Sequence, residues 1–203
     1  MIKNLVFDLG NVLISFRPSE FFDKKNYPEK MKLTILADIF ASKEWLLLDN
    51  GEINTLQAIE GIASKSSLKR EEIEHIFNLR TELIFPLDSN VRLLPGLKKR
   101  GFGLYFLSNF PMDLFEGVKN DYYFFKYFLG GVISAEAKFS KPDRQIYELL
   151  LSRYELNSEE CLFIDDLEVN VNAAEELGMK GLVTFGSLEL DDKINDAINL
   201  HSK

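Results

Sequence analysis

The stretch "LVFDLGNVL", residues 5–13, decides how the rest of the chain is interpreted, because an apolar run there ends in an acid. Near-continuous hydrophobicity over a few residues predicts a strand that is buried on both faces. Taken alone, an aspartate such as Asp8 at the tip of a strand is more often a turn former or a helix cap than a catalyst. Gly10 follows two places later. The role of Asp8 therefore depends on which other groups reach the same place.

Four further apolar runs have the same appearance, each bounded by polar residues or glycine. They are "GLYFLSN" (103–109), "GVIS" (131–134), "CLFIDD" (161–166) and "GLVTF" (181–185). Helical patterns over 142–154 and 168–177 lie between the last three, with Pro142 suited to the first helical position. Strand–helix alternation of this kind predicts a doubly wound α/β fold around a parallel sheet.

The segment from 17 to 90 interrupts this alternation, because helical patterns follow one another there. The patterns span 31–41, 55–64 and 71–84. We interpret 17–90 as a helical cap inserted after the first strand, and 1–16 with 91–203 as the α/β core. Open α/β sheets bind ligands at the carboxyl ends of their strands, so we expect the cap to lie over that edge.

Composition limits the function classes. The chain has 203 residues and a net charge of −8, which argues against a nucleic-acid groove or a site on an anionic membrane. No apolar run approaches the roughly 18–20 residues of a membrane span, and no cleavable leader is evident. The single cysteine, Cys161, excludes a disulfide within the chain. We therefore expect a cytoplasmic protein, monomeric or homodimeric, that acts on a small molecule without a nucleic-acid or membrane partner.

Polar side chains gather at the predicted carboxyl ends of the strands. Asp8 follows the first run, the pair Ser108 and Asn109 the second, and the pair Asp165 and Asp166 the fourth, while Lys141 precedes a predicted helix. Each has an ordinary explanation as a turn former, a helix cap or a solvated lysine. Lys141 fits that explanation least well, because a cation at a helix N-terminus opposes the helix dipole, and an anionic ligand would compensate it.

Together these groups suit phosphoryl transfer. A carboxylate can attack phosphorus and form an acyl phosphate, which divides one difficult hydrolysis into two easier steps. Two anions approach each other only if their charge is neutralised, and Mg²⁺ held by carboxylate and carbonyl oxygens can supply that neutralisation. A lysine, a hydroxyl and backbone N–H groups can hold the remaining phosphoryl oxygens.

The chain resembles the haloacid dehalogenase (HAD) superfamily of aspartate-nucleophile hydrolases, in the branch with a helical cap after the first strand. The matching motifs, in the order and spacing of the family, are "FDLGNVL", "LSN", "SKPDRQIY" and "FIDDLEVNVNAAEELG". The resemblance implies a Rossmann-like core. It also implies that Asp8 is the nucleophile and a metal ligand, that Ser108 and Asn109 contact the transferred group, that Lys141 neutralises it, and that Asp166 with Asp165 completes an Mg²⁺ site.

One position departs from the family pattern. Family phosphatases usually read D-x-D in the first motif, and the second aspartate protonates the leaving group and then activates water. Here that position is Gly10, whose carbonyl can still bind the metal but which has no acid to offer. Cap residues such as Glu20, Asp49 and Glu52 are candidate replacements, and the sequence does not choose between them. Our hypothesis from the sequence is that none of them substitutes fully.

Three functions remain open from the sequence. The first is an Mg²⁺-dependent phosphatase that hydrolyses a small phosphorylated metabolite, such as a sugar phosphate, through a phosphoaspartyl intermediate. The second is a 2-haloacid dehalogenase, which also lacks the second aspartate but uses no metal, so the pair Asp165 and Asp166 argues against it. The third is a catalytically weak protein that keeps the fold for binding or regulation.

Overall fold

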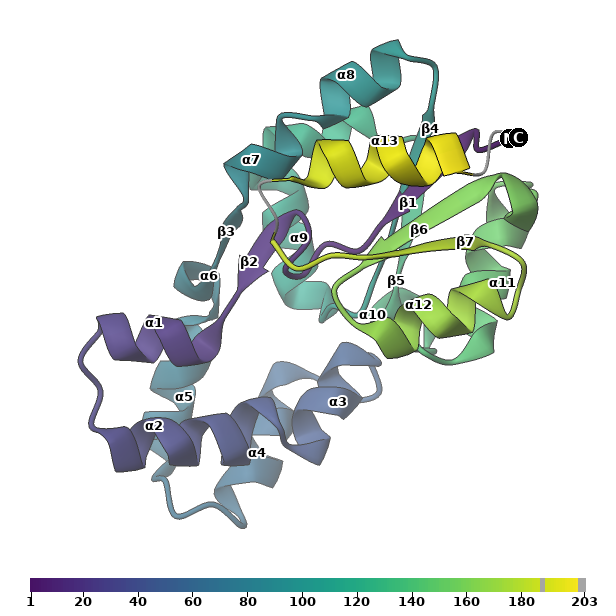
Figure 1. Cartoon of the computed structure of the whole chain (residues 1–203). Coiled ribbons are helices and arrows are strands. Elements are labelled where there is room, and N and C mark those ends of the chain that lie inside the picture. Colours follow the sequence, from purple (N-terminus) through teal and green to yellow (C-terminus); the bar gives the residue numbers. More distant parts are fainter. Residues whose placement is uncertain (187–188, 201–203) are drawn as a thin grey trace.

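A five-stranded parallel sheet forms the centre of the molecule in the computed structural model, which describes residues 1–186 and 189–200. The order of its strands is β5-β4-β1-β6-β7, and every pairing is parallel (Figure 1). The strands are β1 (Asn4–Phe7), β4 (Gly103–Ser108), β5 (Gly130–Ile133), β6 (Cys161–Asp165) and β7 (Lys180–Val183). The predicted parallel α/β fold is therefore confirmed. Residues 187–188 and 201–203 of the predicted core lie outside the described residues.

Helices cover both faces of the sheet (Figure 1). Successive side chains of a strand point to opposite faces, and in β1 Leu5 and Phe7 join one apolar cluster while Val6 joins another. The first cluster contains side chains of α8 (Leu94–Lys99), α9 (Met112–Asp121) and α13 (Leu190–Leu200). The second contains side chains of α11 (Arg144–Arg153) and α12 (Glu168–Glu175). Two short helices, α7 (Asp88–Val91) and α10 (Ser134–Ala137), lie in the connections.

The start of α11 differs from the sequence prediction. Pro142 is not in the first turn of this helix, which begins at Arg144. The Asp143 N–H donates to the Ser140 carbonyl at 2.7 Å, so residues 140–143 form a turn before the helix. Lys141 lies within that turn rather than on the helix, and its side chain is buried. The argument from the helix dipole therefore does not apply to Lys141.

The inserted segment builds a second layer of helices. It contains α1 (Pro18–Lys24), α2 (Glu29–Ile35), a π-helical stretch (Leu36–Phe40), α3 (Lys43–Asp49), α4 (Thr55–Ala63), α5 (Arg70–Asn78) and α6 (Arg80–Leu83). All of these helices except α6 contribute to an apolar cluster of their own, with Phe22 and Ile35 fully buried in it. An antiparallel pair, β2 (Ile14–Phe16) and β3 (Ile84–Pro86), connects this layer to the sheet (Figure 1). The division into core and cap stays a prediction, which these contacts support.

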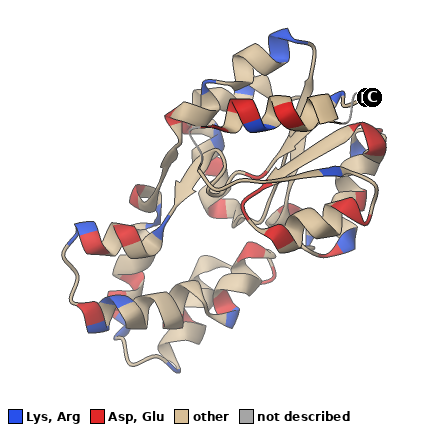
Figure 2. Cartoon of the chain, viewed as in Figure 1, with Lys and Arg blue, Asp and Glu red and all other residues tan. Residues whose placement is uncertain are grey.

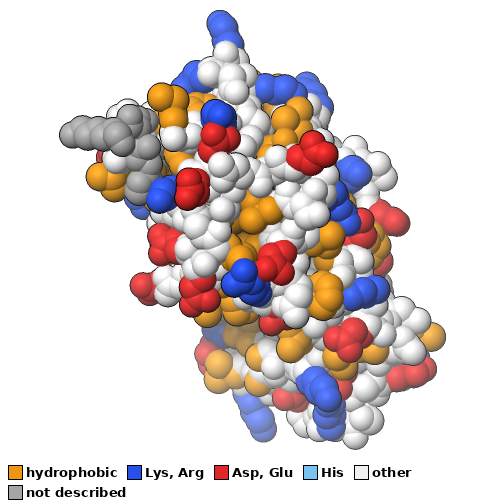
Figure 3. All heavy atoms as spheres, turned by 90° about the vertical axis from the view of Figure 1, so that its right-hand side faces the viewer, with side chains coloured by type: hydrophobic (Ala, Val, Ile, Leu, Met, Phe, Trp, Pro, Cys, Tyr) orange, Lys and Arg blue, Asp and Glu red, His pale blue; other side chains and the backbone are white. Residues whose placement is uncertain are grey.

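The surface carries both signs of charge. Acidic and basic residues occur along the outer helices (Figure 2), and Figure 3 shows them interspersed over one face of the molecule. Within residues 1–186 and 189–200, no helix combines the length and the apolar character that crossing a bilayer requires.

The aromatic segment 121–131 mostly packs inward. Phe124 is fully buried and stacks on Phe125, and the rings of Phe125 and Phe128 both contact Phe106 of β4 edge-on. This segment therefore belongs to the core beside β4 and β5, although Tyr123 is exposed.

Close packing of this segment against the sheet predicts a specific sensitivity at Gly131. A methyl group there would overlap the ring of Phe106, so Gly131→Ala should lower the free energy of unfolding by about 1–3 kcal/mol. Gly117, in the exposed middle of α9, has no atom near an added methyl group, and Gly117→Ala should raise the same quantity by roughly 0.5–1 kcal/mol. Urea unfolding of both variants measures the difference, and equal effects would contradict the packing described here.

Candidate active site

The carboxyl ends of three adjacent strands bring the predicted polar residues together. The sheet order places β1 between β4 and β6. Asp8 follows β1, Ser108 ends β4, and Asp165 ends β6. All three side chains are almost completely buried. Residues more than 150 positions apart in the chain therefore meet at one edge of the sheet, because parallel strands end on the same side.

Lys141 lies between two of these carboxylates. Its Nζ is 2.9 Å from Asp8 Oδ1 and 2.6 Å from Asp165 Oδ2. The Asn109 side chain holds the lysine backbone from both sides, accepting from its N–H at 2.8 Å and donating to its carbonyl at 3.0 Å. Burial alone would lower the pKa of Lys141, but the Asp8 and Asp165 carboxylates outweigh that effect and raise it. The lysine is therefore held as a cation.

Asp8 is a buried carboxyl group whose pKa is raised above its usual value. Its Oδ1 also accepts the backbone N–H of Leu9 at 2.7 Å. The pKa of Asp8 is raised to about 6, because burial, with a smaller contribution from the Asp165 charge, outweighs the lowering by the Lys141 cation and the Ser108 hydroxyl. Lys141 and Ser108 therefore favour the ionised form of Asp8, while burial and Asp165 oppose it.

Asp165 and Asp166 follow one another but have different contacts. Asp165 is fully engaged, since its Oδ2 contacts Lys141 and its Oδ1 accepts from the Leu167 N–H at 2.8 Å and from Asn170 Nδ2 at 3.0 Å. Asp166 is partly buried and accepts from Asn11 Nδ2 at 3.1 Å. Burial raises the pKa of Asp166, and the Asn11 amide offsets part of that rise.

These carboxylates could hold a hard cation. Carboxylate oxygens of Asp8, Asp165 and Asp166 all lie within 4.8 Å of one another. An all-oxygen donor set of this kind is what Mg²⁺ prefers. Because both oxygens of Asp165 already have partners, Asp8 and Asp166 are the better placed of the three to bind a metal directly.

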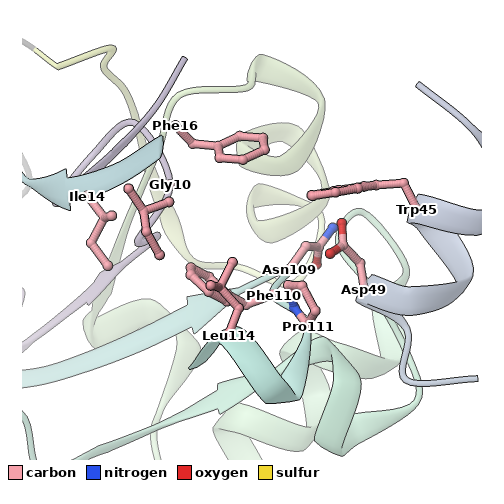
Figure 4. Close-up of a pocket in the computed structure, with 10 residues that line it drawn as sticks. Gly10, Ile14, Phe16, Trp45, Asp49, Asn109, Phe110, Pro111 and Leu114 are labelled. Atoms are coloured by element: carbon pink, nitrogen blue, oxygen red, sulfur yellow. The ribbon is translucent and has the colours of Figure 1, made fainter. Parts of the chain in front are cut away.

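A pocket opens beside these residues on the side of the inserted helices (Figure 4). Figure 4 shows Trp45 and Asp49, both of α3, opposite Gly10 and Ile14. The pocket encloses about 420 Å³, part of it open to solvent. Besides Gly10, Asn109 and Asp49, its lining is apolar and consists of Ile14, Phe16, Trp45, Ile84, Phe110, Pro111 and Leu114.

Comparison with known proteins identifies the family. A family model described as haloacid dehalogenase-like hydrolase matches residues 2–178. The chain belongs to the haloacid dehalogenase-like hydrolases. A protein named sesquiterpene phosphatase, from Aspergillus oryzae, is 30% identical over 92% of this chain and 91% of its own length. A drimenol cyclase from Aspergillus calidoustus is 27% identical over 90% of this chain, which corresponds to 34% of that larger protein.

Solved structures of the same family share the architecture. A HAD family enzyme from Bacteroides thetaiotaomicron, solved in complex with magnesium and inorganic phosphate, is 25% identical, with a TM-score of 0.72 over 92% of this chain and 96% of its own. The L-2-haloacid dehalogenase of Xanthobacter autotrophicus is 16% identical, with a TM-score of 0.68 over 91% of this chain and 78% of its own, which shows a common fold only.

The glycine in the first motif of this HAD-like hydrolase is not required by crowding. A Cβ atom added to Gly10 would meet only Asp8 Oδ2, at an ordinary contact distance of 3.8 Å. The left-handed backbone conformation lies one residue later, at Asn11, with a φ of 54°. The local backbone could therefore accept an acidic side chain at position 10, and its absence is a chemical feature of this hydrolase.

Two asparagines of the site were not found from the sequence. Asn170 is buried in α12 and donates to Asp165, while its own carbonyl accepts from Tyr147 Oη at 2.9 Å. Asn11 donates to Asp166 and accepts from the Phe16 N–H at 3.0 Å. The sequence offers one signal for Asn170, because an asparagine on the apolar face of a helix needs a buried partner.

The contacts of Lys141 predict a large effect on stability. Lys141→Met would leave two buried carboxylates without their cation and should lower the free energy of unfolding by about 3–5 kcal/mol. Adding Asp165→Asn should restore part of the loss, because it removes one of those charges. Arg144→Ala, which breaks an exposed pair with Glu148, should cost less than about 1 kcal/mol. Equal losses for the Lys141 and Arg144 variants in urea unfolding would show that the buried pairs are not needed for stability.

Proposed function

We propose that this hydrolase is an Mg²⁺-dependent phosphatase that forms a phosphoaspartyl intermediate on Asp8. The observation that carries the proposal is the set of three neighbouring carboxylates, Asp8, Asp165 and Asp166, with the Lys141 cation beside them. A displacement at phosphorus needs positive charge around an anionic substrate, and this set offers both a lysine and a place for a metal. The phosphatase name of the Aspergillus oryzae relative and the magnesium and phosphate bound to the Bacteroides enzyme support the same reaction.

Each residue then has a definite role. Asp8 attacks the phosphorus atom, and the Lys141 ammonium neutralises the phosphoryl oxygens during the attack. The Ser108 hydroxyl is hydrogen-bonded to Asp8, and the Asn109 side chain fixes the lysine backbone. Asp8, the Gly10 carbonyl and Asp166 would hold Mg²⁺, with Asp165 anchoring Lys141. Mg²⁺ bound there would neutralise charge on the phosphoryl group.

The pocket indicates what the phosphate is attached to. Seven of its ten lining residues are apolar, and its two polar side chains are Asn109, which follows β4, and Asp49, at the end of α3. A sugar needs several hydrogen-bond partners to replace its water, and this lining offers few. We therefore propose a phosphate monoester with an apolar organic group, of the terpenyl type that the name of the Aspergillus oryzae relative describes, in preference to a sugar phosphate.

The proposed nucleophile is tested by Asp8→Asn. This variant should release phosphate from p-nitrophenyl phosphate more than about 10⁴-fold more slowly than the unmodified protein, because the amide cannot form the acyl phosphate. Activity of the unmodified protein should disappear with a chelator and return with Mg²⁺. Wild-type rates for Asp8→Asn would exclude the mechanism, and chelator-resistant release of halide from a 2-haloacid would identify a dehalogenase instead.

The proposed substrate class is tested by substitutions in the antiparallel pair of β2 and β3. Phe16→Ala removes an aromatic wall of the pocket and should raise KM for farnesyl phosphate about tenfold, while KM for acetyl phosphate changes little. Phe85→Ala is the matched control, since Phe85 is exposed and lies on the neighbouring strand outside this pocket. Steady-state kinetics on farnesyl phosphate, acetyl phosphate and glucose 6-phosphate measures the preference. Faster turnover of the sugar phosphate would exclude an apolar substrate.

A further inference from the structure

The reaction proposed above requires a proton that Gly10 cannot supply. When the P–O bond of an alkyl ester breaks, the leaving oxygen takes the bonding electrons and needs a proton from an acid. We propose that Asp49, the last residue of α3, supplies this proton across the pocket and later removes a proton from the attacking water. The role rests on the proposed phosphatase function. It replaces our sequence-based hypothesis that no cap residue substitutes fully.

The position of Asp49 is fixed by contacts with the core. The Ser134 hydroxyl donates to the Asp49 backbone carbonyl at 2.5 Å, and Lys138 Nζ donates to the carbonyl of Gly51, two residues later. Both donors follow β5, so the end of α3 is attached to the sheet side of the molecule. Among the described residues that line the pocket, Asp49 contributes the only carboxyl group, and Gly10 and Asn109 line the same pocket.

The surroundings of Asp49 suit a group that both donates and accepts a proton. The pKa of Asp49 is raised to about 7, because burial outweighs the lowering by the Trp45 indole and by the charge of Arg80. Arg80 does not neutralise Asp49, because its Nη2 is paired with Asp113 of α9 at 2.9 Å. Charged groups beside this end of α3 include Lys138, bound to the Gly51 carbonyl, and Glu52 in the same segment. Asp113, Glu116 and Glu136 line a neighbouring pocket together with Leu48 and Gly51. Asp8 and Lys141 form the charged pair at the strand tips.

The two other cap carboxylates are placed differently. Glu20 is exposed and pairs with Arg17 at 3.3 Å. Glu52 is exposed and accepts from Asn50 Nδ2 at 3.2 Å. Neither residue lines the pocket that contains Gly10. The structure therefore distinguishes three candidates that the sequence left equal.

The proton balance has two steps. In the first, an oxygen of Asp8 forms a bond to phosphorus, the ester P–O bond breaks, and the leaving oxygen takes the proton of neutral Asp49 to give the alcohol. In the second, ionised Asp49 takes a proton from water, whose oxygen attacks the phosphorus of the acyl phosphate. The bond from Asp8 to phosphorus then breaks. Inorganic phosphate is released, and the Asp8 carboxylate and neutral Asp49 are restored.

The test is Asp49→Asn, measured on esters with different leaving groups. With farnesyl phosphate, kcat should fall about 10²–10⁴-fold, the range that general acid–base catalysis contributes. With p-nitrophenyl phosphate, whose leaving group needs no acid, the first step should stay fast and the second should be slow. The variant should therefore give a burst of p-nitrophenolate stoichiometric with enzyme, followed by slow turnover. The unmodified protein should show a dependence of kcat on pH near 7, where Asp49 titrates, and the variant should lose it.

Three further variants make the result specific. Glu52→Gln, three residues away and outside the pocket, should keep wild-type rates and the wild-type pH profile. Asp49→Glu should recover part of the activity, because it keeps the carboxyl group. Gly10→Asp, for which the backbone has room, should restore turnover of farnesyl phosphate when added to Asp49→Asn. If Asp49 only supported the fold, a carboxyl group introduced at position 10 would not restore the activity lost in Asp49→Asn.

Two outcomes would overturn the assignment separately from the proposed function. Wild-type kcat and pH profile in Asp49→Asn would show that the proton comes from elsewhere. A loss that is the same for both esters, without a burst and without rescue by Gly10→Asp, would show a structural role only. If the unmodified protein released phosphate from none of these esters, the proposed phosphatase function itself would fail, and the role of Asp49 with it.

Discussion

The buried ammonium of Lys141 is the interaction on which the rest of the site depends. It lies 2.9 Å from Asp8 and 2.6 Å from Asp165, so it joins the tips of β1 and β6 through charge. Two carboxylates this close repel each other and cannot both stay ionised in a buried place without a cation between them. Asn109, at the end of β4, holds the lysine backbone and so adds the third strand to the arrangement. The fold and the site are thus stabilised by the same contacts.

In this arrangement the sheet and the inserted helices contribute different groups to the site. The sheet supplies fixed charges, because strands held by parallel pairing place their terminal side chains with little freedom. The helices beyond β2 and β3 contribute Trp45 and Asp49 to the pocket wall opposite Gly10, which is where an organic leaving group would lie in the proposed reaction. With Gly10 lacking a carboxyl group, the acid for that leaving group would come from the second layer, so catalysis would depend on how the two layers meet.

Part of this could be predicted from the sequence, because it follows from local chemistry. The alternation of apolar strands with amphipathic helices predicted the parallel sheet. The polar residues that follow those strands predicted the site residues Asp8, Ser108, Asn109, Asp165 and Asp166. The prediction that α11 starts at Pro142 was wrong. Residues 140–143 form a turn, closed by the hydrogen bond from the Asp143 N–H to the Ser140 carbonyl, and the helix begins only after it, at Arg144. The buried Asn170 and the Asn11 contact were missed, because an asparagine has many uses and its partner is visible only when distant segments pack.

The sequence alone determined that this chain forms a parallel α/β sheet with carboxylates at its strand tips and that position 10 has no acid. Apolar periodicity and the chemistry of side chains are local properties, so these statements need no knowledge of distances. Only the tertiary structure decided that Asp165 binds Lys141 while Asp166 contacts Asn11, and that Asp49 rather than Glu20 or Glu52 lines the pocket. The physical reason is that burial, charge pairing and shared cavities are properties of groups brought together from distant parts of the chain.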